Sequence, residues 1–232
     1  TSAGHKEEVM RRNAVLLVSL AFLLTGCHLL KSSDEAPPVG EAPKVESKGV
    51  AKPGGEAEDR GAVLLVIAFH GYQDKEYDTT HKVLLDAGYR VETASLQTGT
   101  AQGALDGNAV VDLTLMEAVE KLDSYKAVVL IGGPGAAVFH NNETAHELVQ
   151  KAVDAKLVVG AICLAPFTLA NAGVMAGLNA TVWTGGKFTV ESFAKHGPLY
   201  RDEPVVVDGN IVTASGPPAS AEFAAALLKL LK

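Results

Sequence analysis

Residues 157–172 read LVVGAICLAPFTLANA, an apolar run rich in β-branched residues that ends at Cys163 and gives way to a helical pattern. A short apolar run without polar alternation is typical of a parallel strand that is covered on both faces. A cysteine at the end of such a strand, between the small residues Ala161 and Ala165 and followed by Pro166, is typical of a nucleophile elbow. The stretch therefore predicts an α/β fold and a candidate nucleophile within it.

The same alternation of strand and helix patterns continues on both sides of this stretch. Further buried strands are expected at residues 62–69, 90–95 and 127–131, and helices at residues 77–87 and 143–155. Strands and helices in this order predict a doubly wound parallel sheet sandwiched by helices.

The end of the chain closes the same domain, which we expect to span residues 61–232. Residues 204–207 and 211–214 flank Asp208-Gly209-Asn210, and this pattern predicts a hairpin. A final amphipathic helix is expected from about Ser220 to Leu231. A domain of this size buries roughly 70% of its extended surface on folding, which is enough for a core.

Composition excludes several classes of protein. The chain has 232 residues, 47% of them hydrophobic and 20% charged, with a mean hydropathy of +0.17, so the whole cannot be a disordered tail, a collagen or a coiled coil. Lys and Arg number 20 against 27 Asp and Glu, so we expect no nucleic-acid partner. Two cysteines exclude a disulfide scaffold and a four-cysteine zinc site, and no HExxH pattern is present, so neither a metal nor a cofactor is expected.

The first 27 residues resemble the signal peptide of a bacterial lipoprotein. Met10, Arg11 and Arg12 precede AVLLVSLAFLL at residues 14–24, which is too short to span a bilayer. The following Leu24-Thr25-Gly26-Cys27 resembles a lipobox, which predicts cleavage before Cys27 and lipid attachment to its thiol. A buried core helix is the alternative, and both Thr1 and Met10 stand as candidate first residues.

Residues 28–60 read as a disordered linker between the lipid and the domain. They hold no aromatic residue except His28, and they carry four prolines, four glycines and twelve charges. Such a stretch cannot bury enough apolar surface to offset its ordering entropy. We therefore expect a domain in the bacterial cell envelope that faces the periplasm from a lipid anchor on Cys27. His28 follows the anchor in place of an aspartate, which favours the outer membrane.

Sites in open α/β sheets form at the carboxyl ends of strands, where three loops are expected. The first runs from His70 to Glu76, in which Asp74 is able to cap the following helix, the second is GGPGA at 132–136, and the third holds Cys163. Backbone amides and the dipole of a helix start stabilise a thiolate, and lowering the cysteine pKa from about 8.5 to about 5.5 corresponds to about 4 kcal/mol. The alternative is that Cys163 is a small buried hydrophobic residue.

Four segments together resemble the DJ-1/PfpI superfamily, from end to end of the domain and in the right order. They are FHGYQDKEYDTTHKVLLDAGYRVETAS at 69–95, VLIGGPGA at 129–136, GAICLAPFTLANAGVMAGLNATVW at 160–183 and DGNIVTASGPPASAEFAAALL at 208–228. The resemblance implies a flavodoxin-like sandwich related to class I glutamine amidotransferases. It also implies a homodimer.

The resemblance assigns roles to four residues. Cys163 matches the elbow nucleophile, and Glu76 matches a glutamate that is protonated and hydrogen-bonds the cysteine sulfur. A carboxyl beside a thiolate in a partly dry site is pushed toward its neutral form, and only that form donates a hydrogen bond. Gly133 and Leu164 match positions whose backbone N–H groups form the oxyanion hole.

The chain departs from the family pattern where a general base is expected. Protease-like and glyoxalase-like members have a histidine directly after the cysteine, where this chain has Leu164, and a second family position for histidine corresponds to Trp183. His140 and His70 are the candidate accessory residues, although each also fits an ordinary loop residue. Without a base, hydrolysis is slow, so peptidase activity is not expected.

Three functions follow as hypotheses. Cys163 adds to small electrophiles such as reactive carbonyls, with Glu76 handling the proton. Alternatively, an oxidant modifies Cys163 in an oxidative-stress thiol protein. In the third hypothesis the domain binds a ligand without catalysing a reaction, and its elbow is vestigial. These alternatives leave open whether the chain is a cysteine-dependent hydrolase or lyase.

Overall fold

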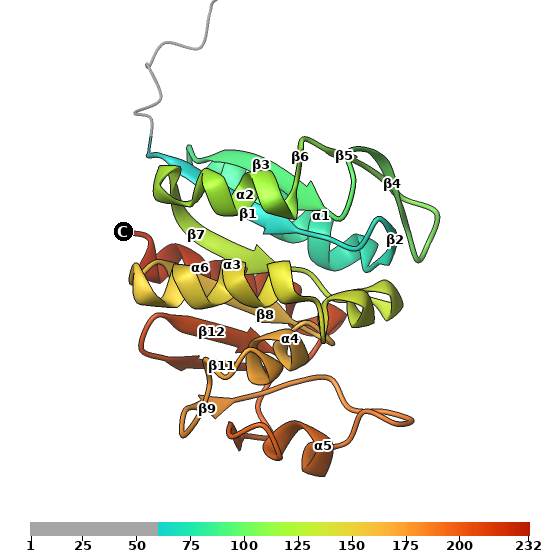
Figure 1. Ribbon diagram of the computed structural model, residues 1–232, viewed down its shortest axis with the longest axis vertical. Coiled ribbons are helices and arrows are strands. Elements are labelled where there is room, and N and C mark those ends of the chain that lie inside the picture. The colour runs from blue at the N-terminus through green and yellow to red at the C-terminus, as the bar shows by residue number, and fades with distance from the viewer. Residues whose placement is uncertain (1–59) are drawn as a thin grey trace, which may run out of the picture. The chain divides into compact units, whose positions relative to one another are not determined.

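The computed structural model describes residues 60–232, which form a central sheet with helices on both of its faces (Figure 1). The export signal and lipobox expected at residues 1–27, including Cys27, lie outside the described residues. The same holds for the linker expected at 28–60, apart from Arg60. Within residues 60–232, no helix has the length and apolar character that a membrane crossing requires.

The central sheet of the described domain has seven strands in the order β11-β12-β8-β7-β1-β3-β6. The strands are β1 (Ala62–Val66), β3 (Arg90–Ser95), β6 (Leu113–Thr114), β7 (Tyr125–Leu130), β8 (Val158–Ile162), β11 (Val205–Asp208) and β12 (Ile211–Ala214). Neighbouring strands are parallel except for β11 and β12, which form the predicted hairpin. The expected doubly wound, flavodoxin-like sheet is therefore confirmed.

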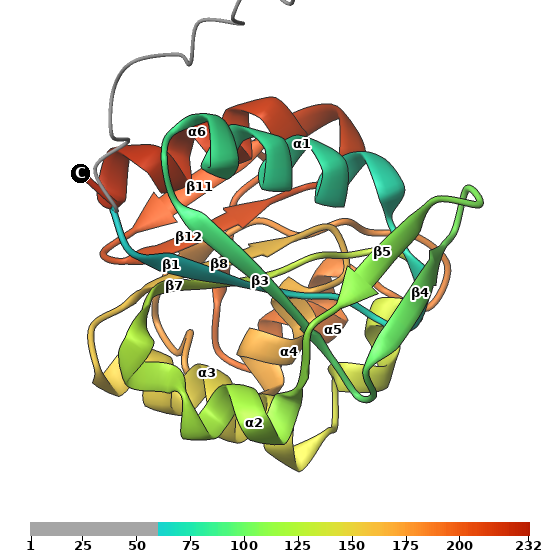
Figure 2. The same ribbon diagram turned by 90° about the horizontal axis from the view of Figure 1, so that it is seen from above.

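Helices cover the sheet in two layers, with α1 and α6 on one face and α2, α3 and α4 on the other (Figure 2). The α-helices are α1 (Asp74–Asp86), α2 (Leu115–Glu120), α3 (Glu143–Asp154), α4 (Pro166–Asn171), α5 (Val190–Ala194) and α6 (Ser220–Leu230). Three 3₁₀ helices accompany them: η1 (Leu122–Ser124), η2 (Pro134–Phe139) and η3 (Pro217–Ala219). The predicted helices at 77–87, 143–155 and 220–231 correspond to α1, α3 and α6.

Strand β8, which ends at the elbow, is buried along its whole length, and a glycine allows a helix to approach it closely. A Cβ on Gly160 would lie 2.8 Å from Leu227 Cδ2 and 3.0 Å from Phe223 Cζ, both in α6. Neighbouring β1 and β7 are buried as well, as expected for central parallel strands. The core therefore surrounds the strands that lead to the candidate site.

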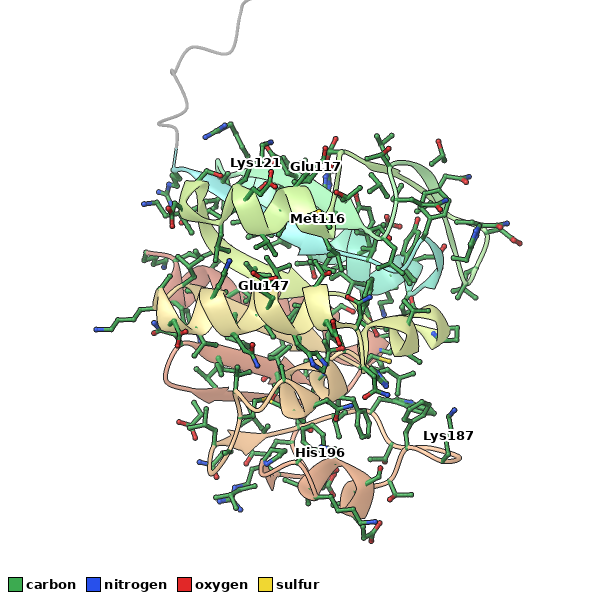
Figure 3. The ribbon with its side chains drawn as sticks, in the orientation of Figure 1. Met116, Glu117, Lys121, Glu147, Lys187 and His196 are labelled. Atoms are coloured by element: carbon green, nitrogen blue, oxygen red, sulfur yellow. The ribbon has the colours of Figure 1, made fainter. Side chains whose placement is uncertain are left out.

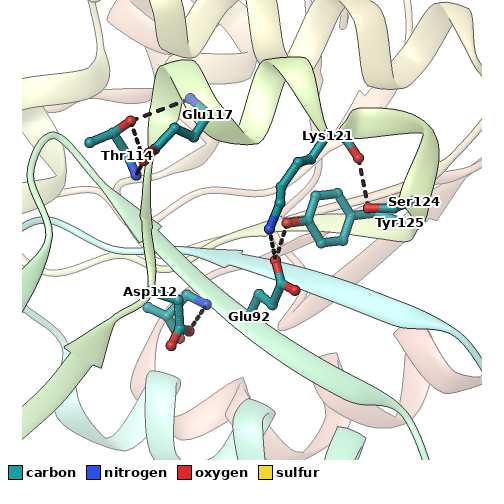
Figure 4. A network of polar contacts seen from close by, with 8 residues as sticks. Glu92, Asp112, Thr114, Glu117, Lys121, Ser124 and Tyr125 are labelled. Carbon is teal, nitrogen blue, oxygen red and sulfur yellow. Dashed lines mark hydrogen bonds and ion pairs between the residues drawn. The ribbon is translucent and has the colours of Figure 1, made fainter.

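Polar contacts hold α2 at the edge of the sheet (Figure 4). Thr114 and Glu117 form a capping box, in which the Thr114 N–H donates to the Glu117 carboxylate at 2.7 Å and the Glu117 N–H donates to Thr114 Oγ1 at 3.3 Å. Below the helix, Glu92 of β3 accepts from the Tyr125 hydroxyl and from Lys121 Nζ at 3.4 Å. These contacts link strands β3, β6 and β7 to the helix that the sequence analysis missed.

The first strand is shorter than predicted, because β1 ends at Val66 rather than at residue 69. The chain then turns into β2 (His70–Tyr72), which pairs with β4 (Gly99–Gly103) in a small sheet with β5 (Asn108–Val111). A second small sheet joins β9 (Asn179–Ala180) and β10 (Leu199–Tyr200). These short strands carry no clear alternation of apolar and polar residues, so their pattern did not predict them.

Asp74 does not cap α1, contrary to the prediction. The N-cap is Gln73, whose side chain accepts a hydrogen bond from the Lys75 N–H at 2.8 Å. The buried Asp74 carboxylate instead accepts from the N–H groups of Leu105 at 2.8 Å and Gly107 at 2.6 Å. Asp74 therefore fastens the β4–β5 connection to the start of α1.

Candidate active site

Cys163 follows directly after β8 and has a φ of +64°, a left-handed conformation that is unfavourable for a residue with a side chain. Its backbone N–H donates to Ala214 O at 2.9 Å, and its carbonyl accepts from the Trp183 N–H at 3.0 Å. Helix α4 begins three residues later, at Pro166. The strand, strained turn and helix make the predicted nucleophile elbow, and neighbouring backbone holds it in place.

The glycine loop after β7 brings the three strand ends together. A Cβ on Gly132 would collide with the Cys163 side chain and would lie 2.8 Å from Glu76 Oε2. Gly133 has a φ of +103°, and a Cβ there would lie 2.5 Å from Gly71 O. Only glycines allow this close approach of the loops after β1, β7 and β8. The structure therefore brings Glu76 and Cys163 together, as the sequence analysis predicted.

Glu76 is fully buried in the first turn of α1. Its Oε2 accepts a hydrogen bond from the Gly132 N–H at 2.9 Å, and the carboxyl also contacts the Cys163 side chain. Burial raises the pKa of Glu76 to about 8, and its contacts with the Gly132 N–H and the Cys163 side chain oppose that rise. The carboxyl is therefore mainly protonated at neutral pH, and a protonated carboxyl can donate a hydrogen bond.

The thiol of Cys163 is also buried, with 7% of the residue exposed. Burial raises the pKa of Cys163 to about 12, and a charge on Glu76 adds to the rise. This direction is opposite to the lowering expected from the helix start, because loss of solvation outweighs the backbone amides. Since Glu76 is itself mainly protonated at neutral pH, its charge acts on the sulfur mainly above about pH 8.

Two backbone amides face the sulfur. The N–H groups of Gly133 and Leu164 hydrogen-bond the Cys163 side chain and lower its pKa. They are the two amides that the resemblance assigned to an oxyanion hole. Donors in this arrangement stabilise negative charge on sulfur and, on a bound molecule, charge that develops on an adjacent oxygen.

His140 lies close to the elbow but its Nε2 is already engaged. The ring is buried, and Nε2 lies 3.0 Å from Leu164 O. A carbonyl only accepts hydrogen bonds, so Nε2 carries the proton and cannot act as a base. Burial also lowers the pKa of His140, which favours the neutral ring. His70, the other accessory candidate, is exposed on β2 with its ring 5.1 Å from that of Phe69.

Trp183 occupies the second position at which family members have a histidine. Its backbone lies beside the elbow, because its N–H donates to Cys163 O. Its ring is 40% exposed and rests against Gly185, whose Cβ would collide with it. The following turn places Lys187 at the outer edge of the molecule (Figure 3), whereas Phe188 packs inward on Phe167 with ring centroids 5.3 Å apart. An aromatic residue beside the nucleophile was not among the predicted site residues.

Gly132 was also missed as a site residue, although it lies within the quoted Gly-Gly-Pro-Gly motif. The signal was therefore present in the sequence, but the contact of Gly132 with both side chains appears only when the strands are assembled. Among residues 60–232, no group of three or more His, Cys, Asp and Glu side chains could hold a metal ion.

Comparisons with known proteins identify relatives of this chain. The family model described as the DJ-1/PfpI family matches residues 62–230. An uncharacterized protein of Methanocaldococcus jannaschii is 33% identical over 96% of this chain and 98% of its own length. Deglycase PfpI of Pyrococcus furiosus is 30% identical over 73% of this chain and 99% of its own. The crystal structure of a ThiJ/PfpI domain protein from Brachyspira murdochii matches with a TM-score of 0.69 and 33% identity, covering 75% of this chain and 96% of that one. The chain belongs to the DJ-1/PfpI family.

Proposed function

We propose that Cys163 is the nucleophile of a DJ-1-type protein that acts on small electrophiles, above all reactive carbonyl compounds. The observation that carries the proposal is the convergence of a buried, raised-pKa carboxyl and two backbone amides on a cysteine in a strained elbow. Strained backbone conformations of this kind cluster at functional sites. The similarity to a deglycase of Pyrococcus furiosus supports the same class of chemistry.

The first step would be addition of sulfur to a carbonyl carbon. The Cys163 sulfur forms a carbon–sulfur bond, and the electron pair of the carbonyl π bond moves to oxygen. Protonated Glu76 gives its proton to that oxygen and takes up the thiol proton in exchange, leaving a hemithioacetal and a neutral carboxyl. The step is balanced without an oxidant or a metal, and the amides of Gly133 and Leu164 are the donors available to the developing negative charge.

Glu76 takes the role that a histidine has elsewhere in the family. A general acid is most effective when its pKa lies near the working pH, and the pKa of Glu76 is raised to about 8. His140 cannot replace it through Nε2, which donates to Leu164 O. The proposal thus explains how the site handles a proton although Leu164 and Trp183 stand where the family has histidines.

The direct test is the rate at which the purified protein consumes methylglyoxal. Cys163→Ala should abolish the activity, and Cys27→Ala, which removes the other cysteine, should leave it unchanged. Equal rates for the wild type and Cys163→Ala would overturn the carbonyl proposal. Mass spectrometry after graded peroxide treatment then examines the oxidative-stress alternative, which fails if Cys163 stays unmodified while a model thiol is oxidised.

Replacing the acid separates its role from that of the nucleophile. Glu76→Gln should slow methylglyoxal consumption by about a hundredfold or more, because no proton donor remains for the oxygen. Alkylation of Cys163 by iodoacetamide should change by less than about tenfold, because that reaction releases iodide and needs no acid. If Glu76→Gln slows both reactions by the same factor, Glu76 affects only the reactivity of the Cys163 sulfur. The proposed proton transfer to the carbonyl oxygen would then be wrong.

We also propose, from sequence, that the protein is anchored in the cell envelope by a lipid on Cys27. Labelling of bacteria with a tagged fatty acid should mark the wild type and not Cys27→Ser. Label on both proteins, or on neither, would contradict the anchor. The expected homodimer is a separate prediction, and sedimentation equilibrium of the purified protein would test it.

A further inference from the structure

We infer that His140 is a positioning residue, which holds the elbow at Leu164 so that the Leu164 N–H stays directed at the Cys163 sulfur. The inference rests on the proposed function, because it concerns how the nucleophile is supported. In this role His140 donates a structural hydrogen bond and does not act as a general base. The residue that it acts through is Leu164, one of the two whose amides contact the sulfur.

The contact is direct and buried. His140 Nε2 donates to Leu164 O at 3.0 Å, and the same oxygen accepts from the Phe167 N–H at 3.2 Å. Leu164 therefore has both of its backbone polar groups committed, with the N–H toward sulfur and the carbonyl toward His140 and α4. A peptide fixed at its carbonyl limits rotation at the adjoining Cα, and this rotation would turn the N–H away from the sulfur.

His140 is itself held from three sides. Its backbone carbonyl accepts from His146 Nε2 of α3 and from Asn171 Nδ2 of α4, each at 2.8 Å. Its ring lies 5.4 Å from that of Phe167 and 5.6 Å from that of Phe188, measured between centroids. Contacts from α3, α4 and the loop before α5 thus fix the donor, as expected where a catalytic group depends on a rigid supporting shell.

The test compares two substitutions of the same residue. His140→Phe keeps an aromatic ring against Phe167 and Phe188 but removes the donor, and iodoacetamide alkylation of Cys163 at pH 7 should slow by about tenfold, which corresponds to one pKa unit. His140→Gln keeps a side-chain N–H and should restore the rate to within about threefold of the wild type. The matched control is His196→Phe at an exposed position beyond α5 (Figure 3), which should alkylate like the wild type.

The outcomes separate the inference from the proposed function. An alkylation rate for His140→Phe equal to that of the wild type would overturn the positioning role while leaving the nucleophile in place. A slow rate in both variants would show that a side-chain N–H at this position is not sufficient to restore the reactivity of Cys163, which also overturns the inference. A wild type that does not consume methylglyoxal would instead reject the proposed function.

A measurement on the wild type keeps the inference testable if His140→Phe does not fold. Long-range proton–nitrogen spectra of the imidazole distinguish its two tautomers. We expect the His140 proton on Nε2, with slow exchange because the contact is buried. A proton on Nδ1 would leave no donor for Leu164 O and would contradict the inference.

Discussion

Glu76 and Cys163 are two acids buried against each other beneath a glycine loop, and burial disfavours the charged form of each. The pair therefore behaves as one coupled system, in which Glu76, with a pKa of about 8, loses its proton before Cys163, with a pKa of about 12. The N–H groups of Gly133 and Leu164 favour the charge on sulfur, whereas the N–H of Gly132 favours it on oxygen. Small changes in these amides decide how much thiolate the site holds.

A single substitution at Gly132 should disturb Glu76 and Cys163 directly, because a Cβ at this position would meet both side chains. Gly132→Ala should destabilise the protein by about 1–3 kcal/mol through overpacking and slow methylglyoxal consumption at least tenfold, since the new Cβ would separate Glu76 from Cys163. Urea unfolding and a rate assay would measure the two effects.

The control for this substitution is Gly173→Ala. Gly173 has a φ of +79° and no atom within 4 Å of the position that a Cβ would take, so strain alone should lower stability by about 1–2 kcal/mol. Its reaction rate should equal that of the wild type. If Gly132→Ala also reacts at the wild-type rate, the close contact between the glycine loop and the two acids has no catalytic importance.

Helix α1 connects the site to the small sheet of β2, β4 and β5. Glu76 points from α1 toward Gly132, whereas Asp74, two residues earlier, holds the backbone between β4 and β5. The first turn of α1 therefore supplies both the candidate acid, Glu76, and the side chain of Asp74, which binds the β4–β5 connection. Movement at the Asp74 contact would change the position of the Glu76 carboxyl.

Asp74→Ala should release the β4–β5 connection. Two part-buried N–H groups would lose a charged acceptor, which predicts a loss of about 1–3 kcal/mol in the free energy of unfolding. Hydrogen exchange at Leu105 and Gly107 should accelerate more than elsewhere. Asp78→Ala, at an exposed position of the same helix, should change stability by less than about 0.5 kcal/mol. Unchanged exchange at both amides in Asp74→Ala would contradict the assigned contact.

The stability of the folded protein should depend on pH through Glu76. Its pKa is 4.5 in the unfolded chain and about 8 in the folded protein, so between these values the folded state retains a proton that the unfolded state has lost. The free energy of unfolding therefore falls as pH rises, by up to about 1.4 kcal/mol per pH unit for one group. The raised pKa of Cys163, about 12, acts only at higher pH.

Urea unfolding of the wild type and Glu76→Gln at pH 5 and pH 8 would measure this dependence. The wild type should lose about 3–4 kcal/mol more than the variant between the two values. Comparing the difference removes the contribution of the other titrating groups, which both proteins share. Equal losses in the two proteins would show that Glu76 ionises with an ordinary pKa, and its proposed role as an acid at neutral pH would fail.

Much of the fold was predictable from the chain alone, because it depends on local patterns. Uninterrupted β-branched runs predicted β1, β7 and β8, with β1 extended too far, and Asp208-Gly209-Asn210 predicted the hairpin of β11 and β12. Cys163 followed by Pro166 predicted the elbow, and the structure adds that Cys163 has a positive φ. The short strands β2, β4 and β5 were missed because no periodic pattern marks them.

What the chain alone determined is the list of chemical groups and the strand ends at which they lie. The tertiary structure decided the rest, because protonation and hydrogen bonding depend on burial and on residues far apart in sequence. It showed that Glu76 lies against Gly132, that the Nε2–H of His140 is held by Leu164 O, and that Asp74 binds a distant loop instead of capping its helix. Desolvation has no signature in a local pattern, so the raised pKa values of Glu76 and Cys163 could be found only once the strands were packed together.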